Sequence, residues 1–139
     1  MFKKILVAVD DSPIAKKGVQ IALDLAAKYE GSICALTVVP LPDYSATVGE
    51  VNEAQSEGQL RGERILSQVK RMAENQGIEI GTKVLFGHPA DKIVAYAIEK
   101  GFDVLVIGYK GVSGIERFLL GSVSSKVIHH SPCTVILVK

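Results

Sequence analysis

The sequence has few cysteines and almost no excess of positive over negative charge. Only Cys34 and Cys133 occur among 139 residues, and they lie far apart, which excludes a C-x-x-C redox or zinc motif. Two isolated thiols inside apolar runs are typical of a reducing compartment, so we expect the cytoplasm. The 16 basic and 15 acidic residues form no basic stripe and no polybasic tail. This balance argues against nucleic acid and against a membrane surface as partners.

Long hydrophobic runs are also missing. No apolar stretch approaches the roughly 20 residues of a membrane-spanning helix. Lys3 and Lys4 precede an apolar run, as in a signal peptide, but this run ends at Val9 against two aspartates. The length of 139 residues predicts one domain, 1–139, large enough to bury a core without disulfides or structural metals.

The sequence does contain a regular alternation of short apolar runs and segments with a helical period. The runs predict strands at 5–9, 33–39, 79–86, 104–107 and 134–138. The helical spacing predicts helices over 13–30, between 57 and 76, over 89–100 and over 122–129, and residues 40–56 are interpreted as a long loop. This order predicts an α/β fold in which helices cover both faces of a parallel sheet. Ligands of such sheets bind beyond the carboxyl ends of the strands.

The stretch KILVAVDDSP, residues 4–13, ends a predicted strand with Asp10 and Asp11. A phosphoryl receiver domain begins with such an acidic pair, but it also needs a third-strand aspartate that accepts the phosphoryl group. The predicted third strand, EIGTKVLFG, has no aspartate, and the fifth strand offers only the terminal Lys139 as a phosphoryl contact. We therefore reject the receiver. The acidic pair is equally compatible with a solvated strand end beside a helix start, where Ser12 can cap the helix and Pro13 fits its first turn.

A glycine-rich segment between the predicted fourth strand and the last helix forms the second candidate site. Gly108 lets a ligand approach the backbone, and Gly111 permits a left-handed turn that can gather N–H groups. Gly121 opens a helix whose N–H groups and dipole attract an anion, and Ser122 and Ser124 add hydroxyls. Together they predict a cradle for a polyphosphate. A plain glycine-rich turn with an ordinary serine cap is the alternative, since neither G-x-G-x-x-G after the first strand nor a Walker G-K-[ST] occurs.

The spacing G-x2-G-x9-G-[ST] within GYKGVSGIERFLLGSVSS, residues 108–125, resembles the nucleotide-binding signature of the universal stress protein family. Three further stretches are similar to the same family, so the resemblance covers the whole chain: ILVAVDDSPIAKKGVQIALDLA, GHPADKIVAYAIEKGFDVLVIGYKG and GSVSSKVIHHSPCTVILVK. The resemblance implies a three-layer, doubly wound, Rossmann-like fold of the adenine nucleotide alpha hydrolase type. Its five parallel strands would lie in the order 3-2-1-4-5.

The resemblance also implies a binding site for ATP. Asp10 would meet the ribose or adenine side, and the backbone of Val38 would read the adenine edge. The other implied nucleotide-binding residues are Ala8 and Val9 at the adenine, Gly108 and Gly111 at ribose and phosphates, and Gly121, Ser122, Val123 and Ser124 at the phosphates. Mg²⁺ or Mn²⁺ would be bound with the phosphates, and water would complete its shell. Asp11 and the Tyr109-Lys110 pair depart from the common family pattern and leave the preference among ATP, ADP and AMP open.

The implied function is that of a nucleotide-dependent stress-response and signalling module, acting as a homodimer through the last strand, Thr134–Val138. No residue of the signature is an obvious general base, and Asp10 would lie away from the γ-phosphate, so we assign no catalytic residue and expect at most weak ATP hydrolysis. A slow ATPase or phosphotransferase using the same pocket is the alternative, and a nucleotide-free scaffold is a third hypothesis. His129 and His130 end the last predicted helix, where cations are favourable, and we predict no metal site there.

Overall fold

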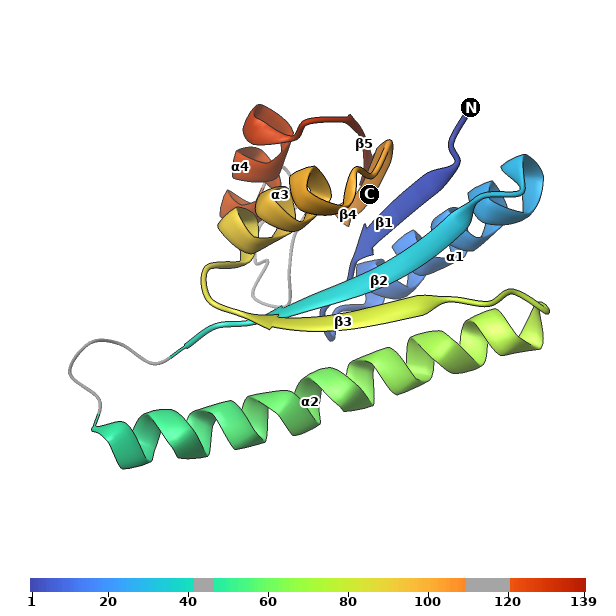
Figure 1. The fold of residues 1–139 in the computed structure, drawn as a ribbon. Coiled ribbons are helices and arrows are strands. Elements are labelled where there is room, and N and C mark those ends of the chain that lie inside the picture. The colour runs from blue at the N-terminus through green and yellow to red at the C-terminus, as the bar shows by residue number, and fades with distance from the viewer. Residues whose placement is uncertain (42–46, 110–120) are drawn as a thin grey trace.

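Strands and helices alternate along the chain in the computed structural model, which describes residues 1–41, 47–109 and 121–139. In chain order the elements are β1 (Lys4–Ala8), α1 (Pro13–Tyr29), β2 (Ser32–Val39), α2 (Val48–Asn75), β3 (Gly81–Phe86), α3 (Pro89–Lys100), β4 (Val104–Gly108), α4 (Ser122–His130) and β5 (Thr134–Val138). The strands form one parallel five-stranded sheet in the order β3-β2-β1-β4-β5 (Figure 1). The α/β fold and the strand order expected above are therefore confirmed.

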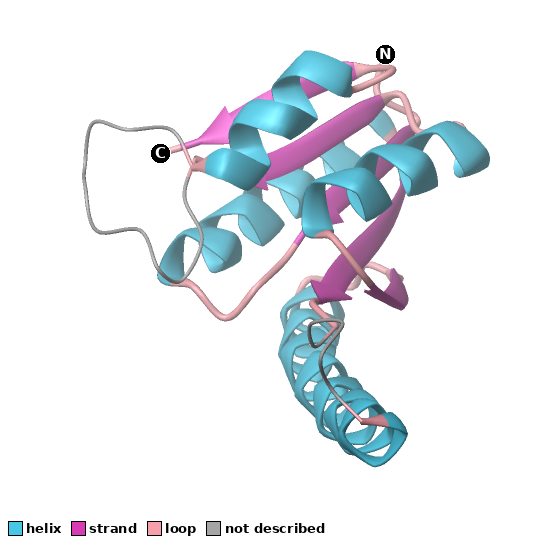
Figure 2. Cartoon of the chain, turned by 90° about the vertical axis from the view of Figure 1, so that its left-hand side faces the viewer, coloured by secondary structure: helices cyan, strands magenta, loops and turns pink. Residues whose placement is uncertain are grey.

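Helices cover both faces of the sheet, as strands that are apolar on both sides require. Buried side chains of α1 and α2 pack against one face, and those of α3 and α4 pack against the other. Figure 1 shows α3 and α4 together on one side, and Figure 2, turned by 90°, shows the sheet between the helical layers. Successive residues of β1 serve the two faces in turn, because Ile5 and Val7 pack toward α1 while Leu6 packs toward α3 and α4.

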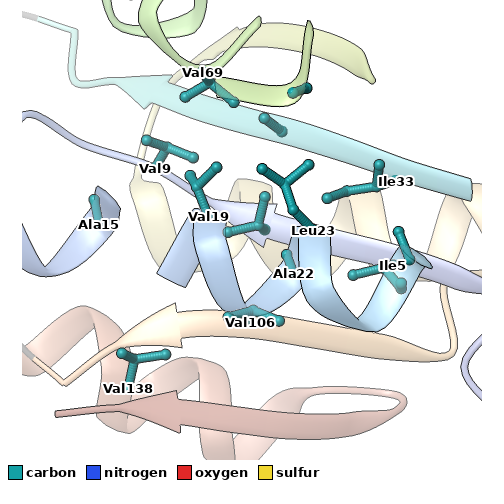
Figure 3. Packing of buried hydrophobic residues seen from close by; sticks show 14 of the residues in the cluster. Ile5, Val9, Ala15, Val19, Ala22, Leu23, Ile33, Val69, Val106 and Val138 are labelled. Carbon is teal, nitrogen blue, oxygen red and sulfur yellow. The ribbon is translucent and has the colours of Figure 1, made fainter. Parts of the chain in front are cut away.

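The core on the α1 face runs through the middle of the molecule. Figure 3 shows it extending from Val69 of α2, past Val19 and Leu23 of α1, to Val138 of β5. Val19 and Leu23 are completely buried. Burying one such side chain stabilises the fold by roughly 1.5–3 kcal/mol relative to leaving it in water. This continuous apolar contact holds the strands, and hence their carboxyl ends, in fixed relative positions.

The helix α2 begins earlier than the sequence analysis expects. The helix starts at Val48, so the interpretation of residues 40–56 as a loop is wrong for 48–56. The side chain of Thr47 accepts a hydrogen bond from the N–H of Glu50 at 3.1 Å, and the Glu50 carboxylate accepts one from the N–H of Thr47 at 3.4 Å. This capping box gives partners to two amides and offsets the weak helix formers in the first turns. The N-terminal turns of α2 extend past the carboxyl end of β3 (Figure 1).

Candidate functional site

The carboxyl edge of the sheet has a step at its central strand. The register pairs Ala8, the last residue of β1, with Leu36 of β2, and β2 continues beyond this level to Val39. On the other side of β1, the strand β4 also continues, to Gly108. We call this feature the β1 step. It lies where the strand order reverses, which is the place where doubly wound sheets bind their ligands.

The backbone of Val38 faces the β1 step without a strand partner. The N–H of Val9 donates to the carbonyl of Leu36 at 2.8 Å, and this bond is the last rung between β1 and β2. Because alternate residues of a strand direct N–H and C=O to the same side, Val38 directs both toward the position above β1. Val39 faces the other way, since its carbonyl accepts from the N–H of Gly87 at 3.0 Å. Within the described ranges nothing pairs with the Val38 backbone on the β1 side. The step is thus bordered by one donor and one acceptor at a fixed spacing.

Asp10 lies in the turn that follows β1 and is half-buried. Its Oδ1 accepts a hydrogen bond from the N–H of Ser12 at 2.9 Å and a second one from the hydroxyl of Ser12. The Ser12 oxygen in turn accepts from the N–H of Ala15 at 3.3 Å and so caps α1, as the sequence predicts. No described residue donates to Oδ2 of Asp10. Asp10 therefore offers one acceptor oxygen beside the step.

Three hydrogen bonds join the end of β4 to the end of β5 and to the start of α4. The N–H of Tyr109 donates to the carbonyl of Val138 at 2.9 Å, and the N–H of Gly121 donates to the carbonyl of Tyr109 at 2.8 Å. The hydroxyl of Ser124 donates to the carbonyl of Gly108 at 2.6 Å. Because Tyr109 and Gly121 are joined directly, the first turn of α4 is held beside the end of β4.

The first turn of α4 presents unpaired amides. The N–H groups of Ser122, Val123 and Ser124 precede the first intrahelical bond, which runs from the N–H of Ser125 to the carbonyl of Gly121 at 2.9 Å. No acceptor for these three groups occurs in the part of the chain that the structure describes. Such amides, together with the positive end of the helix dipole, form a binding place for an anion.

The predicted phosphate-binding groups differ in how available they are to a ligand. The N–H of Gly121 is already bonded, and the hydroxyl of Ser124, which is 3% exposed, donates to a backbone carbonyl instead of facing outward. Ser122 is exposed and Val123 is half-buried. Gly111 lies outside the described residues. The groups that remain available to an anion are therefore mainly the amides of the first turn of α4.

Ala8 and Val9 lie at the end of β1 on opposite faces of the sheet. Ala8 is half-buried and packs with the cluster on the α3 and α4 face. Val9 is 6% exposed and packs with the cluster on the α1 face. Of the two side chains implied for the adenine pocket, Ala8 is thus the one with more surface left for a ligand.

Sequence reasoning misses two residues that shape this site. Ser12 is expected only as a helix cap, but it also binds the carboxylate of Asp10. The D-x-S spacing is the available signal, because an aspartate commonly accepts from the backbone two residues later. Tyr109 links three segments through its backbone, and no side-chain pattern reveals such a role.

Other features of the described residues do not compete with this site. A groove of about 500 Å³ lies between α2 and β3, and another of about 370 Å³ lies between α3 and α4, and neither is lined by a residue predicted to bind nucleotide. No three His, Cys, Asp or Glu side chains among the described residues are grouped so that they could hold a metal ion. None of the described helices has the length and apolar character needed to cross a membrane.

Comparison with known proteins identifies the family. Residues 1–139 match the model of the universal stress protein family. The chain belongs to this family. A universal stress protein of Methanocaldococcus jannaschii is 34% identical over 144 residues, which cover 100% of this chain and 83% of that relative. The universal stress protein YxiE of Bacillus subtilis is 34% identical over 148 residues, which cover 100% of both chains.

Solved universal stress protein structures share the fold. UspA from Lactobacillus plantarum has a TM-score of 0.88 and 24% identity, and the match covers 99% of this chain and 98% of that one. A universal stress protein solved in complex with cAMP has a TM-score of 0.76 and 27% identity, with 99% and 97% of the two chains covered. The sheet order and the helical layers of this universal stress protein are therefore those of its family.

Proposed function

We propose that this universal stress protein binds ATP and works as a nucleotide-dependent signalling module in the form of a homodimer. The observation that carries the proposal is the β1 step, where the unpaired backbone of Val38 and the unpaired amides of the α4 first turn border one carboxyl edge. A donor and an acceptor on one strand suit the edge of an adenine, and several amides at a helix start suit phosphates.

The order of groups along this edge suggests how a nucleotide lies. The base would pair with the backbone of Val38, Asp10 would accept from the ribose or the base, and the phosphates would reach the amides of Ser122, Val123 and Ser124. The relative solved with cAMP supports an adenine nucleotide as the ligand class. Mg²⁺ or Mn²⁺ would be bound through the phosphates and water, because the described residues offer no three-ligand cluster of their own.

A substitution that removes one backbone N–H, that of Ser122, tests the proposed phosphate site. Ser122 is the first residue of α4, where proline is well tolerated, and the extended conformation of Gly121 (φ −62°, ψ 151°) is the one that a following proline requires. Ser122→Pro removes an N–H and a hydroxyl, whereas the matched control Ser122→Ala removes only the hydroxyl. In equilibrium dialysis with ATP, ADP and AMP, we expect Ser122→Pro to weaken ATP binding about tenfold and Ser122→Ala to change it little. Equal affinities of the two variants would refute the role of the amide.

The same preparation distinguishes binding from turnover. Mass spectrometry of small molecules released from the purified protein should detect ATP, and incubation with radiolabelled ATP should retain it stoichiometrically without product. Steady release of ADP that Gly121→Val abolishes would support the slow ATPase or phosphotransferase instead. Absence of any nucleotide uptake at millimolar ATP would support a nucleotide-free scaffold.

The homodimer is proposed through the open edge of β5. Among the described strands, β5 pairs only with β4, and its sequence TVILV has no charged residue that would discourage pairing. Because the carbonyl of Val138 accepts from β4, the alternation of a strand directs the N–H and C=O of Val135 and Leu137 outward. An antiparallel copy of β5 could bind these groups.

Proline substitution at the two edges of the sheet tests this dimer. Val135→Pro removes an outward N–H from β5 without removing a bond to β4. The matched control, Thr82→Pro, removes an outward N–H from β3 at the opposite edge, since Gly87 and the odd-numbered residues of β3 face β2. By sedimentation at micromolar protein, we expect a monomer for Val135→Pro and a dimer for the control. A monomeric parent chain would exclude the dimer.

A further inference from the structure

We propose that Ser12 is a positioning residue for nucleotide binding, which holds the Asp10 carboxylate so that only Oδ2 is presented to the ligand. The inference rests on the proposed function, because it assumes that Asp10 accepts a hydrogen bond from the nucleoside. The inference goes beyond the proposed function because it assigns the orientation of Asp10 to a residue that would not touch the ligand.

Among the described residues, Ser12 supplies both of the hydrogen bonds that the Asp10 carboxylate accepts. Ser12 is 6% exposed, so water does not compete effectively for its groups. Its N–H and its hydroxyl both donate to Oδ1 of Asp10, and its oxygen accepts from the N–H of Ala15. Two donors on one carboxylate oxygen fix both the position and the rotation of the carboxylate plane.

Because Ser12 binds Oδ1, the Asp10 carboxylate is already oriented before a ligand arrives. An aspartate in an open turn can rotate about its side-chain bonds, and binding must then cover the entropy of fixing one orientation. In this structure the orientation is already fixed by the turn that begins α1. The oxygen that is left without a described donor, Oδ2, is the one that a ribose hydroxyl or a base amino group could reach.

The competing explanation is that Ser12 serves only as the cap of α1. Glycine and alanine separate the two roles, because glycine is nearly as good a cap as serine and alanine is a poor one. Both residues keep the N–H that donates to Oδ1 of Asp10 and lack the hydroxyl, so the two variants test what the hydroxyl contributes to holding the carboxylate. A capping role predicts that Ser12→Gly behaves like the parent, whereas a positioning role predicts that Ser12→Gly and Ser12→Ala lose affinity equally.

A double-mutant cycle with ATP completes the test. By isothermal titration of the full chain, we expect Ser12→Gly to weaken ATP binding about tenfold, the effect of one misdirected charge-assisted hydrogen bond. On the background of Asp10→Ala, the same substitution should change affinity less than about twofold, because there is no carboxylate left to position. Thermal melts of all four proteins report the capping effect separately.

The possible results distinguish the positioning role of Ser12 from the proposed function. Coupling between positions 12 and 10, with Ser12→Gly close to the parent in melting temperature, supports the inference. Unchanged affinity of Ser12→Gly, or an equal loss with and without Asp10, overturns it while leaving the proposed function intact. Failure of the parent chain to bind ATP overturns the proposed function, and the positioning role falls with it.

Discussion

Gly58 of α2 lies so close to the end of β2 that a side chain at this position would collide with the strand. An added Cβ would lie 2.5 Å from Cγ1 of Val39 and 3.4 Å from the ring of Phe86. Atoms cannot approach to 2.5 Å without repulsion, so the Val39 side chain, α2 or the end of β2 would have to shift. Val39 follows Val38 directly, so a shift of β2 would reach the backbone that we propose to bind the base.

Two effects oppose each other in Gly58→Ala. Replacing a glycine inside a helix by alanine favours the helix by about 1 kcal/mol. An extra carbon forced into a tight contact typically costs about 1–3 kcal/mol. The backbone fixes the position of the new methyl group, and because Val39 is only 6% exposed its side chain has little room to move away. We expect the steric penalty to be larger, which gives a net destabilisation of about 1 kcal/mol.

Gly49→Ala is the matched control in the same helix. Its added Cβ would meet nothing closer than Oγ1 of Thr47 at 4.0 Å, so only the gain in helix propensity remains, about 0.5 kcal/mol. Urea unfolding followed by circular dichroism measures both variants, and titration with ATP measures the effect on the site. We expect Gly58→Ala to have a lower midpoint and weaker ATP binding than the parent, and Gly49→Ala to have a higher midpoint and the parent affinity. If Gly58→Ala proves as stable as Gly49→Ala, the close packing of α2 on β2 is refuted.

Three further predictions concern hydrogen bonds and titrating groups. The Asp103 carboxylate accepts from two backbone N–H groups at the start of β1, at 2.9 and 3.1 Å, so Asp103→Ala should lower the free energy of unfolding by about 2 kcal/mol. This site lies at the amino end of β1, and unchanged ATP affinity is expected; a large loss of affinity would contradict that. Ser124→Ala removes a buried bond to the end of β4 and should cost about 1–2 kcal/mol in urea unfolding, whereas the exposed Ser122→Ala should cost little, and equal losses would argue against the bond. Burial raises the pKa of the Cys34 thiol, and burial together with that thiol raises the pKa of Tyr96 to about 12. Both groups are favoured in their protonated forms by folding, so their contribution to stability is present below about pH 9 and is lost as the pH rises through the raised values. Unfolding curves between pH 7 and 11 should show a decline that is shallower in Tyr96→Phe, and identical slopes would count against this assignment.

The strands of the sheet can be predicted from the sequence, because the central strands are buried on both faces and therefore appear as continuous apolar runs. The start of α2 is misjudged because the prolines and glycine of residues 40–56 suggest a loop, yet the T-x-x-E spacing of Thr47 and Glu50 is a visible capping-box signal. The end of α1 shows the limit of local patterns. Glu30 adopts the left-handed conformation (φ 52°) expected for a glycine, while Gly31 is needed because a Cβ there would lie 2.6 Å from the carbonyl of Phe2.

For the candidate site, the sequence reveals residues that act through their side-chain type, but not those that act through their position in the fold. Asp10 and the glycine signature are visible in the sequence because their residue types carry the chemistry. The role of Val38 comes from its backbone, and only the family resemblance suggests it, since its exposure depends on where β1 ends relative to β2. The direction of the Ser124 hydroxyl is also beyond sequence reasoning, because a serine at a helix start serves a ligand or a neighbouring carbonyl equally well.

The β1 step has a local cause, which is the early start of α1. The N–H of Val9 makes the last bond to β2, and after it the turn closed by the hydrogen bonds from Ser12 to Asp10 leads directly into α1. The same turn therefore leaves the backbone of Val38 unpaired and fixes the carboxylate of Asp10 beside it. In the proposed function, base recognition and ribose recognition would thus be coupled through one short segment. It follows that changes which lengthen β1 should weaken nucleotide binding even where they leave Asp10 itself untouched, because an added rung would occupy the N–H and C=O that the base requires.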